Sequence, residues 1–245
     1  MKINCDMGES FGLWQLGCDE QVMPFLDMAN IACGMHASDP VVMKKTVQLA
    51  KQHGVIIGAH PGYPDLQGFG RRFIAMEKDE LDAFFIYQLG ALQAICQSES
   101  VVLSYVKPHG ALYNAMMKDD DVFLTLLSAL NQYNSDLPLV VMAVPDYRKY
   151  QDLAATYGIQ LWFEAFVDRA YDDSGRLTPR SVSGSSLTTI EQIEQQALML
   201  IEEQAVISLS GQKIAIHADT LCIHGDGGAL SLPTAQVLSA RLNRQ

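Results

Sequence analysis

Five apolar segments of this chain each run straight into a short turn rich in histidine, carboxylate and glycine residues. The segments with their turns are residues 3–9, 29–36, 55–62, 105–110 and 221–226. In a ring of parallel strands joined by helices, the C-terminal ends of the strands meet at one mouth, where α/β barrels build their active sites. The pattern therefore predicts an enzyme whose site gathers residues that are distant in the sequence.

Strand-like and helix-like segments alternate along the chain, which predicts a parallel sheet with right-handed crossovers. We expect strands at residues 2–5, 29–33, 55–59, 101–106, 139–144, 160–164 and 219–223, and helices at 40–53, 77–97, 119–133, 146–157 and 188–205. The first prediction is an α/β fold, a distorted (β/α) TIM-like barrel of about seven parallel strands that forms a single domain over residues 1–245. A doubly wound open sheet is the alternative, because periodicity does not distinguish the two.

Two helices have recognisable signals at their ends. Asp39 is the expected N-cap of the helix that begins at Pro40, and Gly54 is expected to end that helix. Thr188, with Glu191 three residues later, resembles a capping box and predicts the start of another helix.

The composition excludes several classes of protein. A net charge of −11 argues against a general affinity for nucleic acid or for an anionic membrane. No apolar run approaches the ~20 residues that a membrane-spanning helix needs, and the first residues show no long apolar stretch of the kind found in secretory signals. The five cysteines are an odd number and form no C-x-x-C pair, so we expect a cytoplasmic protein with free thiols.

The first two strand exits carry carboxylates and a histidine. Asp6 and Glu9 lie three residues apart after the first strand, and paired carboxylates suit acid–base catalysis or the binding of a cation or an amine. Alternatively, Glu9 is a solvated loop charge and Asp6 a cap. His36 follows the second strand and is expected to face the same mouth.

The third exit holds the densest group of polar and glycine residues. His60 is followed by two prolines and then by the run Gly68-Phe69-Gly70-Arg71-Arg72, in which glycines would permit a close backbone approach. We expect one of the two arginines to clamp a carboxylate or phosphate, the alternative being a surface pair. The run lacks the third glycine of a dinucleotide-binding fingerprint.

The remaining exits supply a lysine, two histidines and further charges. Lys107 and His109 lie two residues apart, so in extended geometry both would point the same way and could together stabilise an oxyanion and move a proton. Later exits carry Glu164, Asp168, Arg169, His224 and Asp226. An Asp168–Arg169 pair could be structural, whereas a carboxylate beside His224 could orient a catalytic imidazole.

The chemistry of the histidines has two interpretations. Together with Asp6 they could bind a divalent metal, or they could form a metal-free network for proton transfer, and spacing does not decide between these. The sequence contains no G-x-x-x-x-G-K-[ST] loop, no G-x-S-x-G elbow and no H-E-x-x-H motif. We therefore expect neither P-loop ATP hydrolysis by this chain alone nor a serine acyl-enzyme.

Taken together, these blocks resemble the LamB/YcsF family of subunits of the bacterial ATP-dependent 5-oxoprolinase. The resemblance extends over essentially the whole chain and is carried by residues 4–9, 30–36, 58–65, 68–72, 107–114, 168–171 and 224–226. One departure is Ser38, where the family is expected to favour glycine.

The resemblance implies a distorted barrel similar to the polysaccharide-deacetylase type. It also implies cleavage of 5-oxoproline to glutamate with hydrolysis of ATP, in a complex with two partners, the B and C subunits. Mg²⁺ is expected to accompany the ATP. A metal-dependent amide or N-acetyl hydrolase and a non-catalytic subunit that binds a small carboxylate are the alternatives.

The site prediction combines this resemblance with the strand exits. The residues expected to be catalytic are Asp6, His36, His60, Lys107, His109, Asp168 and His224. The residues expected to bind substrate are Glu9, Arg71, Arg72, Glu164, Arg169 and Asp226. Within these sets, Asp6 or His60 is the expected base, Lys107 and His109 the electrostatic and acid groups, and Arg71 or Arg169 the clamp on the substrate carboxylate.

Overall fold

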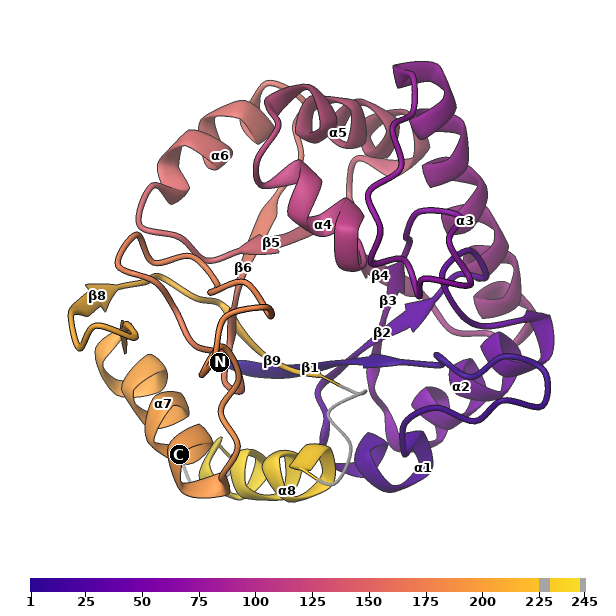
Figure 1. The fold of residues 1–245 in the computed structure, drawn as a ribbon. Coiled ribbons are helices and arrows are strands. Elements are labelled where there is room, and N and C mark those ends of the chain that lie inside the picture. The colour runs from indigo at the N-terminus through magenta and orange to yellow at the C-terminus, as the bar shows by residue number, and fades with distance from the viewer. Residues whose placement is uncertain (225–229, 243–245) are drawn as a thin grey trace.

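A closed barrel of parallel strands forms the centre of the molecule, with helices around it (Figure 1). The computed structural model describes residues 1–224 and 230–242. In barrel order the strands are β1 (Lys2–Met7), β2 (Met28–Ala32), β3 (Ile56–His60), β4 (Leu103–Val106), β5 (Leu139–Met142), β6 (Leu161–Phe166) and β9 (Thr220–Ile223). Because β9 pairs with both β1 and β6, the ring closes. The barrel prediction is therefore confirmed, and the open sheet is excluded.

Five of the helices around the barrel were expected from the apolar periodicity. They are α2 (Pro40–His53), α3 (Lys78–Ser98), α5 (Asp120–Asn134), α6 (Tyr147–Ala155) and α7 (Ile190–Glu203). The sequence prediction lacks α1 (Asp19–Val22), the 3₁₀ turn η1 (Met23–Phe25), α4 (Gly110–Met116), α8 (Ser231–Leu242) and the hairpin of β7 (Ala205–Ile207) with β8 (Lys213–Ala215). No helix in the described part of the chain combines the length and the apolar character needed to cross a bilayer.

The ends of two helices test the capping predictions. Asp39 caps α2 by accepting hydrogen bonds from the Val41 and Val42 amides, and Gly54 ends the helix in the left-handed region, as expected. For α7 the prediction was wrong by one residue. Thr189, not Thr188, is the N-cap, and its hydroxyl accepts from the Gln192 amide, because the helix begins at Ile190.

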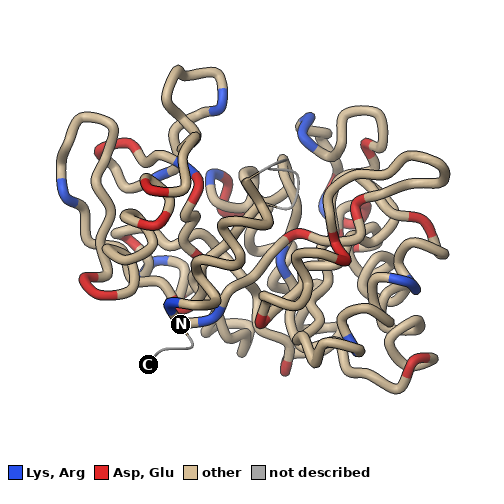
Figure 2. Tube along the Cα trace, turned by 90° about the horizontal axis from the view of Figure 1, so that it is seen from below, with Lys and Arg blue, Asp and Glu red and all other residues tan. Residues whose placement is uncertain are grey.

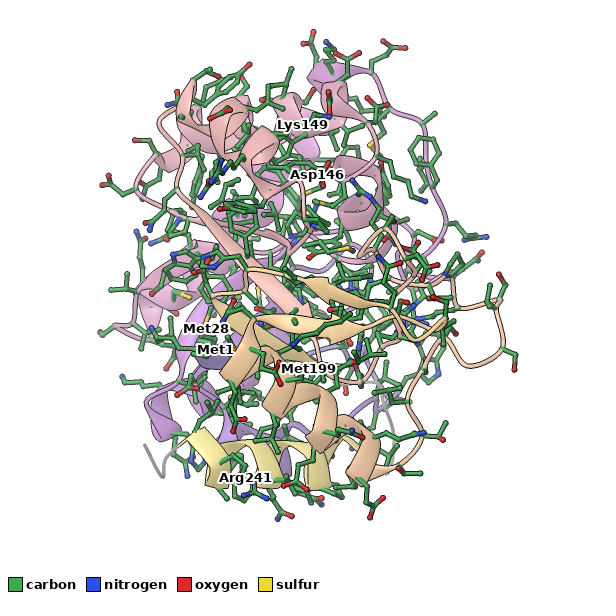
Figure 3. The ribbon with its side chains drawn as sticks, turned by 90° about the vertical axis from the view of Figure 1, so that its left-hand side faces the viewer. Met1, Met28, Asp146, Lys149, Met199 and Arg241 are labelled. Atoms are coloured by element: carbon green, nitrogen blue, oxygen red, sulfur yellow. The ribbon has the colours of Figure 1, made fainter. Side chains whose placement is uncertain are left out.

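The barrel interior near the strand starts is filled by a small apolar group. Met28, Tyr105 and Val140 pack there as a cluster separate from the main core. Figure 3 shows Met1 and Met28 close together where β1 and β2 begin. The Tyr105 ring is fully buried beside Gly58 on the neighbouring strand, and a Cβ at position 58 would collide with that ring. The barrel thus requires glycine at this point of β3.

We predict that Gly58→Ala lowers the free energy of unfolding by about 1–3 kcal/mol, because overpacking forces a buried aromatic ring or the strand to move. Gly90→Ala in α3 is the matched control, since nothing lies within 4 Å of the added Cβ and alanine favours a helix. Urea denaturation followed by circular dichroism would measure both changes. Equal stabilities of the two variants would contradict the packing argument.

Candidate active site

A cavity of about 390 Å³ opens at the C-terminal ends of the strands. It lies at the end of the barrel where α/β barrels place their catalytic groups. Of the residues expected in the site, the cavity is lined by Asp6, Glu9, His60, Arg71, Lys107, His109, Arg169 and His224. The structure therefore brings together groups from five strand exits that span most of the sequence.

A buried ammonium lies at the floor of this cavity between two carboxylates. Lys107 Nζ donates to Asp6 Oδ1 at 2.8 Å and forms an ion pair with Glu164 Oε2 at 3.1 Å. Burial alone would lower the pKa of Lys107, but Asp6 and Glu164 raise it well above the ordinary value. Glu164 is completely buried beneath the cavity, so it acts on Lys107 rather than on a molecule in the cavity.

Among the described residues, the two hydrogen bonds that hold Asp6 both reach the same carboxylate oxygen. Oδ1 accepts from Asn30 Nδ2 at 2.8 Å as well as from Lys107, and Tyr105 in turn donates to Asn30 Oδ1 at 2.6 Å. Oδ2 lies 3.5 Å from His60 Nε2. Burial would raise the pKa of Asp6, but its interactions with His60 and Lys107 hold it well below the usual range. Asp6 is therefore an ionised carboxylate with one oxygen left for chemistry.

Backbone carbonyls fix the tautomers of His60 and His109. His60 Nδ1 lies 2.7 Å from the Lys107 carbonyl oxygen, and His109 Nε2 lies 2.8 Å from the Phe69 carbonyl oxygen. A carbonyl oxygen only accepts hydrogen bonds, so these two nitrogens carry the protons. The other two nitrogens, His60 Nε2 and His109 Nδ1, face each other at 3.0 Å.

Glu9 and His36 complete a compact group with these histidines. His36 stacks on His109 with ring centroids 3.7 Å apart, and its Nε2 lies 3.3 Å from Glu9 Oε1. Burial and the neighbouring histidines lower the pKa of His36 well below its ordinary value, and burial and His60 lower the pKa of His109 to about 3. Both rings are neutral at pH 7. One ligand atom from each of the four residues falls within 4.8 Å of the others, so the group could hold a metal ion.

The glycine-rich loop after β3 closes over this histidine group. Gly70 has a φ of +63°, and a Cβ there would lie 2.6 Å from His36 Cβ and 2.7 Å from His109 Cδ2. The loop thus needs glycine both for its backbone conformation and for its close approach. Ser38, the departure from the expected family pattern, also has a positive φ of 73°, which explains why glycine would suit that position.

His224 pairs with a carboxylate from another strand exit. Its Nδ1 lies 2.8 Å and 2.9 Å from the two Asp168 oxygens, because β6 and β9 are neighbours in the barrel. Asp226, the carboxylate expected to pair with His224, lies outside the described residues. Asp168 and Arg169 do not form the structural pair considered above, since Arg169 instead donates to the carbonyls of Ser185 and Thr178.

Within the described part of the chain, four arginines line the cavity, although the net charge is −11 and the acidic residues are widely distributed (Figure 2). They are Arg71, Arg169, Arg176 and Arg180. Arg176 belongs to a segment that looks like a solvated turn in the sequence, and nothing in the sequence marks its approach to the cavity. Arg72 is not among these four, because its exposed side chain pairs with the buried Asp65.

A family model described as LamB/YcsF matches residues 1–245. The chain belongs to the LamB/YcsF family. Curated relatives named as the A subunit of 5-oxoprolinase include one from Vibrio campbellii, which is 54% identical over 226 residues and aligns over 92% of this chain and 89% of its own length. The relative from Vibrio cholerae is 51% identical over 242 residues, with 99% of this chain and 96% of its own length covered.

Solved structures share the barrel fold of this LamB/YcsF chain. A protein described as a lactam utilization protein from Thermus thermophilus superimposes with a TM-score of 0.92 at 40% identity, covering 100% of this chain and 96% of that one. A β-1,4-mannanase superimposes with a TM-score of 0.55 at 11% identity, covering 100% and 98% of the two chains. The second likeness concerns the barrel fold alone.

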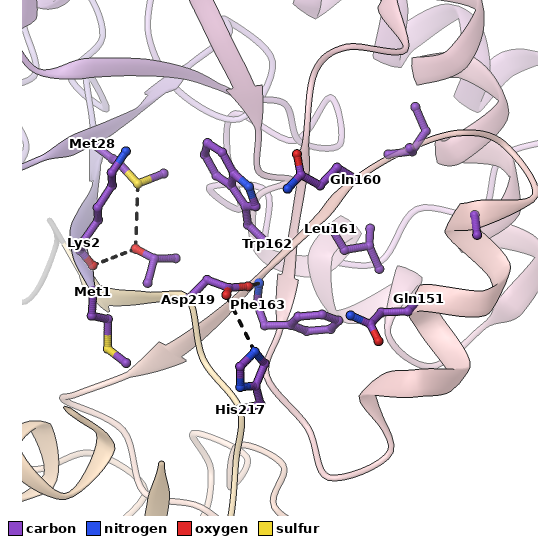
Figure 4. Close-up of a pocket in the computed structure, with 13 residues that line it drawn as sticks. Met1, Lys2, Met28, Gln151, Gln160, Leu161, Trp162, Phe163, His217 and Asp219 are labelled. Carbon is purple, nitrogen blue, oxygen red and sulfur yellow. Dashed lines mark hydrogen bonds and ion pairs between the residues drawn. The ribbon is translucent and has the colours of Figure 1, made fainter. Parts of the chain in front are cut away.

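A larger cavity, of about 730 Å³, lies at the opposite end of the barrel of this LamB/YcsF protein (Figure 4). It is bordered by Lys2, Met28, Trp162, His217 and Asp219. His217 and Asp219 form only a loose contact of 3.8 Å between partly exposed side chains. The converging ionisable groups lie at the smaller cavity, so size does not identify the active site.

We predict that Lys107→Met destabilises the protein by about 3–5 kcal/mol, because it leaves two carboxylates without their buried cation. Adding Glu164→Gln should restore part of that loss, so the two changes should not be additive. Lys149→Met is the control, since Lys149 forms an exposed pair with Asp120 that contributes less than about 1 kcal/mol. Urea denaturation of the single and double variants would measure the coupling, and additive effects would contradict it.

Proposed function

We propose that this chain acts as the A subunit of an ATP-dependent 5-oxoprolinase, which opens the ring of 5-oxo-L-proline to L-glutamate while ATP is hydrolysed to ADP and phosphate. The B and C subunits are the expected partners. The observation that carries the proposal is the identity of 51% with a relative named as the A subunit of 5-oxoprolinase, over 99% of this chain. The cavity supports it, because it offers a carboxylate base, imidazoles and guanidinium groups in one place.

The reaction explains why the groups in this cavity need an activated substrate. The lactam of 5-oxoproline is a stable amide with a poor leaving group. Transfer of the γ-phosphoryl group of ATP to the lactam oxygen gives an imidate-type phosphate, whose carbon water attacks more readily. The protein must then supply a base for the water, donors for the developing negative charge and an acid for the ring nitrogen.

Asp6 is the base in this scheme, and Lys107 positions it. The Asp6 carboxylate is ionised, its Oδ1 is held by Asn30 and Lys107, and its Oδ2 is left to accept a proton from water. Lys107 is enclosed by Asp6, Asn4, Cys222 and Glu164, so its charge acts through Asp6 and through the field in the cavity.

His224 suits the role of the acid better than His109, which the sequence favours. Asp168 holds His224 through Nδ1 and the ring lines the cavity, so Nε2 is the nitrogen proposed to exchange a proton with the ring nitrogen of the substrate. His109 has a pKa of about 3, lowered by burial and by His60, and its Nε2–H is engaged with the Phe69 carbonyl. A group with that pKa holds no second proton to donate at pH 7.

The arginines around the cavity suit an anionic substrate. Arg71 and Arg169 are the proposed clamp on the 5-oxoproline carboxylate, and Arg176 and Arg180 add positive charge at the same opening. This chain has no P-loop motif, so the partner subunits are proposed to hold most of the ATP, together with Mg²⁺. The localisation that fits this metabolic role is the cytoplasm.

The decisive experiment measures glutamate release from 5-oxoproline by the purified chain, with and without ATP and with and without the B and C subunits. Release only with ATP and both partners is the expected result. Release by the chain alone, without ATP and abolished by a chelator, would instead favour a metal-dependent amide hydrolase, which the group of Glu9 and three histidines makes the second candidate. Binding of 5-oxoproline without turnover in a complete complex would favour a non-catalytic role.

We predict that Asp6→Asn lowers glutamate release by the full complex by about 10²–10⁴-fold, the usual contribution of a general base. Asp152→Asn, at an exposed position of α6, is the matched control and should keep full activity. Steady-state kinetics on variants with unchanged circular dichroism would test the role. Full activity of a folded Asp6→Asn complex would refute it. Full activity of a folded His109→Ala complex would likewise show that His109 is not a catalytic group.

We also predict that Arg71→Met raises the KM for 5-oxoproline at least about tenfold, since removing a charge-assisted hydrogen bond to a carboxylate costs about 1.5–3 kcal/mol. Arg148→Met on α6, whose guanidinium lies over the Tyr147 ring, serves as the control. The measurement is KM and kcat for 5-oxoproline at saturating ATP. An unchanged KM would assign the clamp to another arginine.

A further inference from the structure

We propose that Glu9, His36, His60 and His109 form a binding site for a late first-row divalent metal ion of the Zn²⁺ type. The site lies against the wall of the cavity, beside Asp6. The proposal concerns this chain alone and goes beyond its role in opening 5-oxoproline, because neither the lactam chemistry nor the ATP chemistry above makes use of a metal at this position.

The strongest argument comes from the two nitrogens that face each other. The Lys107 and Phe69 carbonyls place the ring protons on His60 Nδ1 and His109 Nε2, so His60 Nε2 and His109 Nδ1 present lone pairs to each other across 3.0 Å. Two lone pairs at that distance repel each other. A cation bound by both nitrogens would attract both lone pairs. Without a bound partner, two buried acceptor nitrogens facing each other cost free energy.

The distances between the donor atoms fit one ion. An ion with tetrahedral bonds of about 2.0–2.1 Å separates its ligand atoms by about 3.3 Å. The observed separations are 3.0 Å from His60 Nε2 to His109 Nδ1, 3.5 Å from His109 Nδ1 to Glu9 Oε1, and 3.3 Å from Glu9 Oε1 to His36 Nε2. All four ligand atoms lie within 4.8 Å of one another, so side-chain adjustments that shorten the longer separations would let the group surround one ion.

The surroundings of the histidines are those of a metal site. Histidine ligands usually donate their second ring N–H to a carbonyl or carboxylate, which fixes the ring and its tautomer. His60 and His109 both do so here, and Gly70 allows the loop that carries the Phe69 carbonyl to lie against His36 and His109. The fully buried His36 Nδ1 has no hydrogen-bond partner within the described residues, which leaves that ring to be oriented by stacking on His109.

The donor set selects the class of metal. Imidazole nitrogens with one carboxylate suit Zn²⁺, Co²⁺, Ni²⁺ or Fe²⁺, whereas Mg²⁺ and Ca²⁺ prefer a shell of oxygens. The Mg²⁺ that accompanies ATP therefore belongs elsewhere. Glu9, His60 and His109 line the cavity, so an ion can enter from solvent without opening the barrel.

The competing occupant is a proton. If His60 or His109 were protonated on the facing nitrogen, an N–H···N hydrogen bond would remove the same repulsion without any metal. The two possibilities differ in one measurable property. Only the metal site predicts stoichiometric metal binding that depends on these four side chains.

The test uses the purified full-length chain, stripped of metal with a chelator and then titrated with Co²⁺ while visible absorption is recorded. Zn²⁺ content is measured by elemental analysis after gel filtration. We expect about one ion per chain in the wild-type protein and in the control His53→Asn, which changes an exposed histidine. His60→Asn and His109→Asn should weaken binding by more than the roughly 10–100-fold that changes to a ligand's supporting partners cost.

Two outcomes overturn the proposal. One is a wild-type chain that binds no Co²⁺ or Zn²⁺ at micromolar concentrations, which would assign the facing nitrogens to a shared proton. The other is binding that is the same in the wild-type protein and in folded His60→Asn or Glu9→Gln. If the histidine variants fail to fold, the wild-type melting temperature decides, since one equivalent of Zn²⁺ should raise it and an unchanged value refutes the site. Because the readout is bound metal, its failure leaves the 5-oxoprolinase assay unaffected.

Discussion

The ammonium of Lys107 is the charge on which the interior of this barrel depends. It lies between Asp6 on β1 and Glu164 on β6, and without it two buried carboxylates would share a low-dielectric space. The side chain reaches them from the end of β4, so one ion network links three strands that are distant in the sequence. The stability of the fold and the protonation state of the site therefore both depend on Lys107. The polar barrel interior is tolerated because this ammonium compensates the two carboxylates.

A ladder of neutral polar side chains extends this network across the sheet. Asn4 donates to Thr220 Oγ1 on β9, Asn30 on β2 donates to Asn4 Oδ1, and the Tyr105 hydroxyl donates to Asn30 Oδ1. Each of these groups is fully or almost fully buried and hydrogen-bonded, so the ladder avoids the cost of unsatisfied polar atoms. It also fixes the rotamer of Asn30 and thereby the orientation of Asp6. The carboxylate proposed as the base is thus oriented from below by the barrel core, while its other oxygen lies beside His60.

The sequence allowed the strands and the set of strand-exit residues to be predicted, because each β-strand is a short apolar run and each exit follows it locally. Which of these side chains contact one another could not be predicted in the same way. His224 contacts Asp168 only because β9 closes the ring next to β6, and His60 meets His109 only because β3 and β4 are neighbours. Arg72 and Arg71 are adjacent in the sequence, yet one turns to Asp65 and the other to the cavity. Helix α4 was missed because its seven residues begin at Gly110, inside an exit that looks like a turn.

The electrostatics of Asp6 account for the need to activate the substrate. The interactions of Asp6 with His60 and Lys107 outweigh burial and hold the pKa of Asp6 well below its ordinary value, so the carboxylate is ionised but is a weak base. A cation held between His60 and His109 would lie beside Oδ2 and would weaken that base further. A weak base of this kind removes a proton from water only while that water attacks a strongly electrophilic carbon. An unactivated lactam does not offer that carbon, whereas a phosphorylated lactam does. These properties support the proposal that the protein acts after phosphoryl transfer, on an anionic intermediate that the arginines lining the cavity would attract.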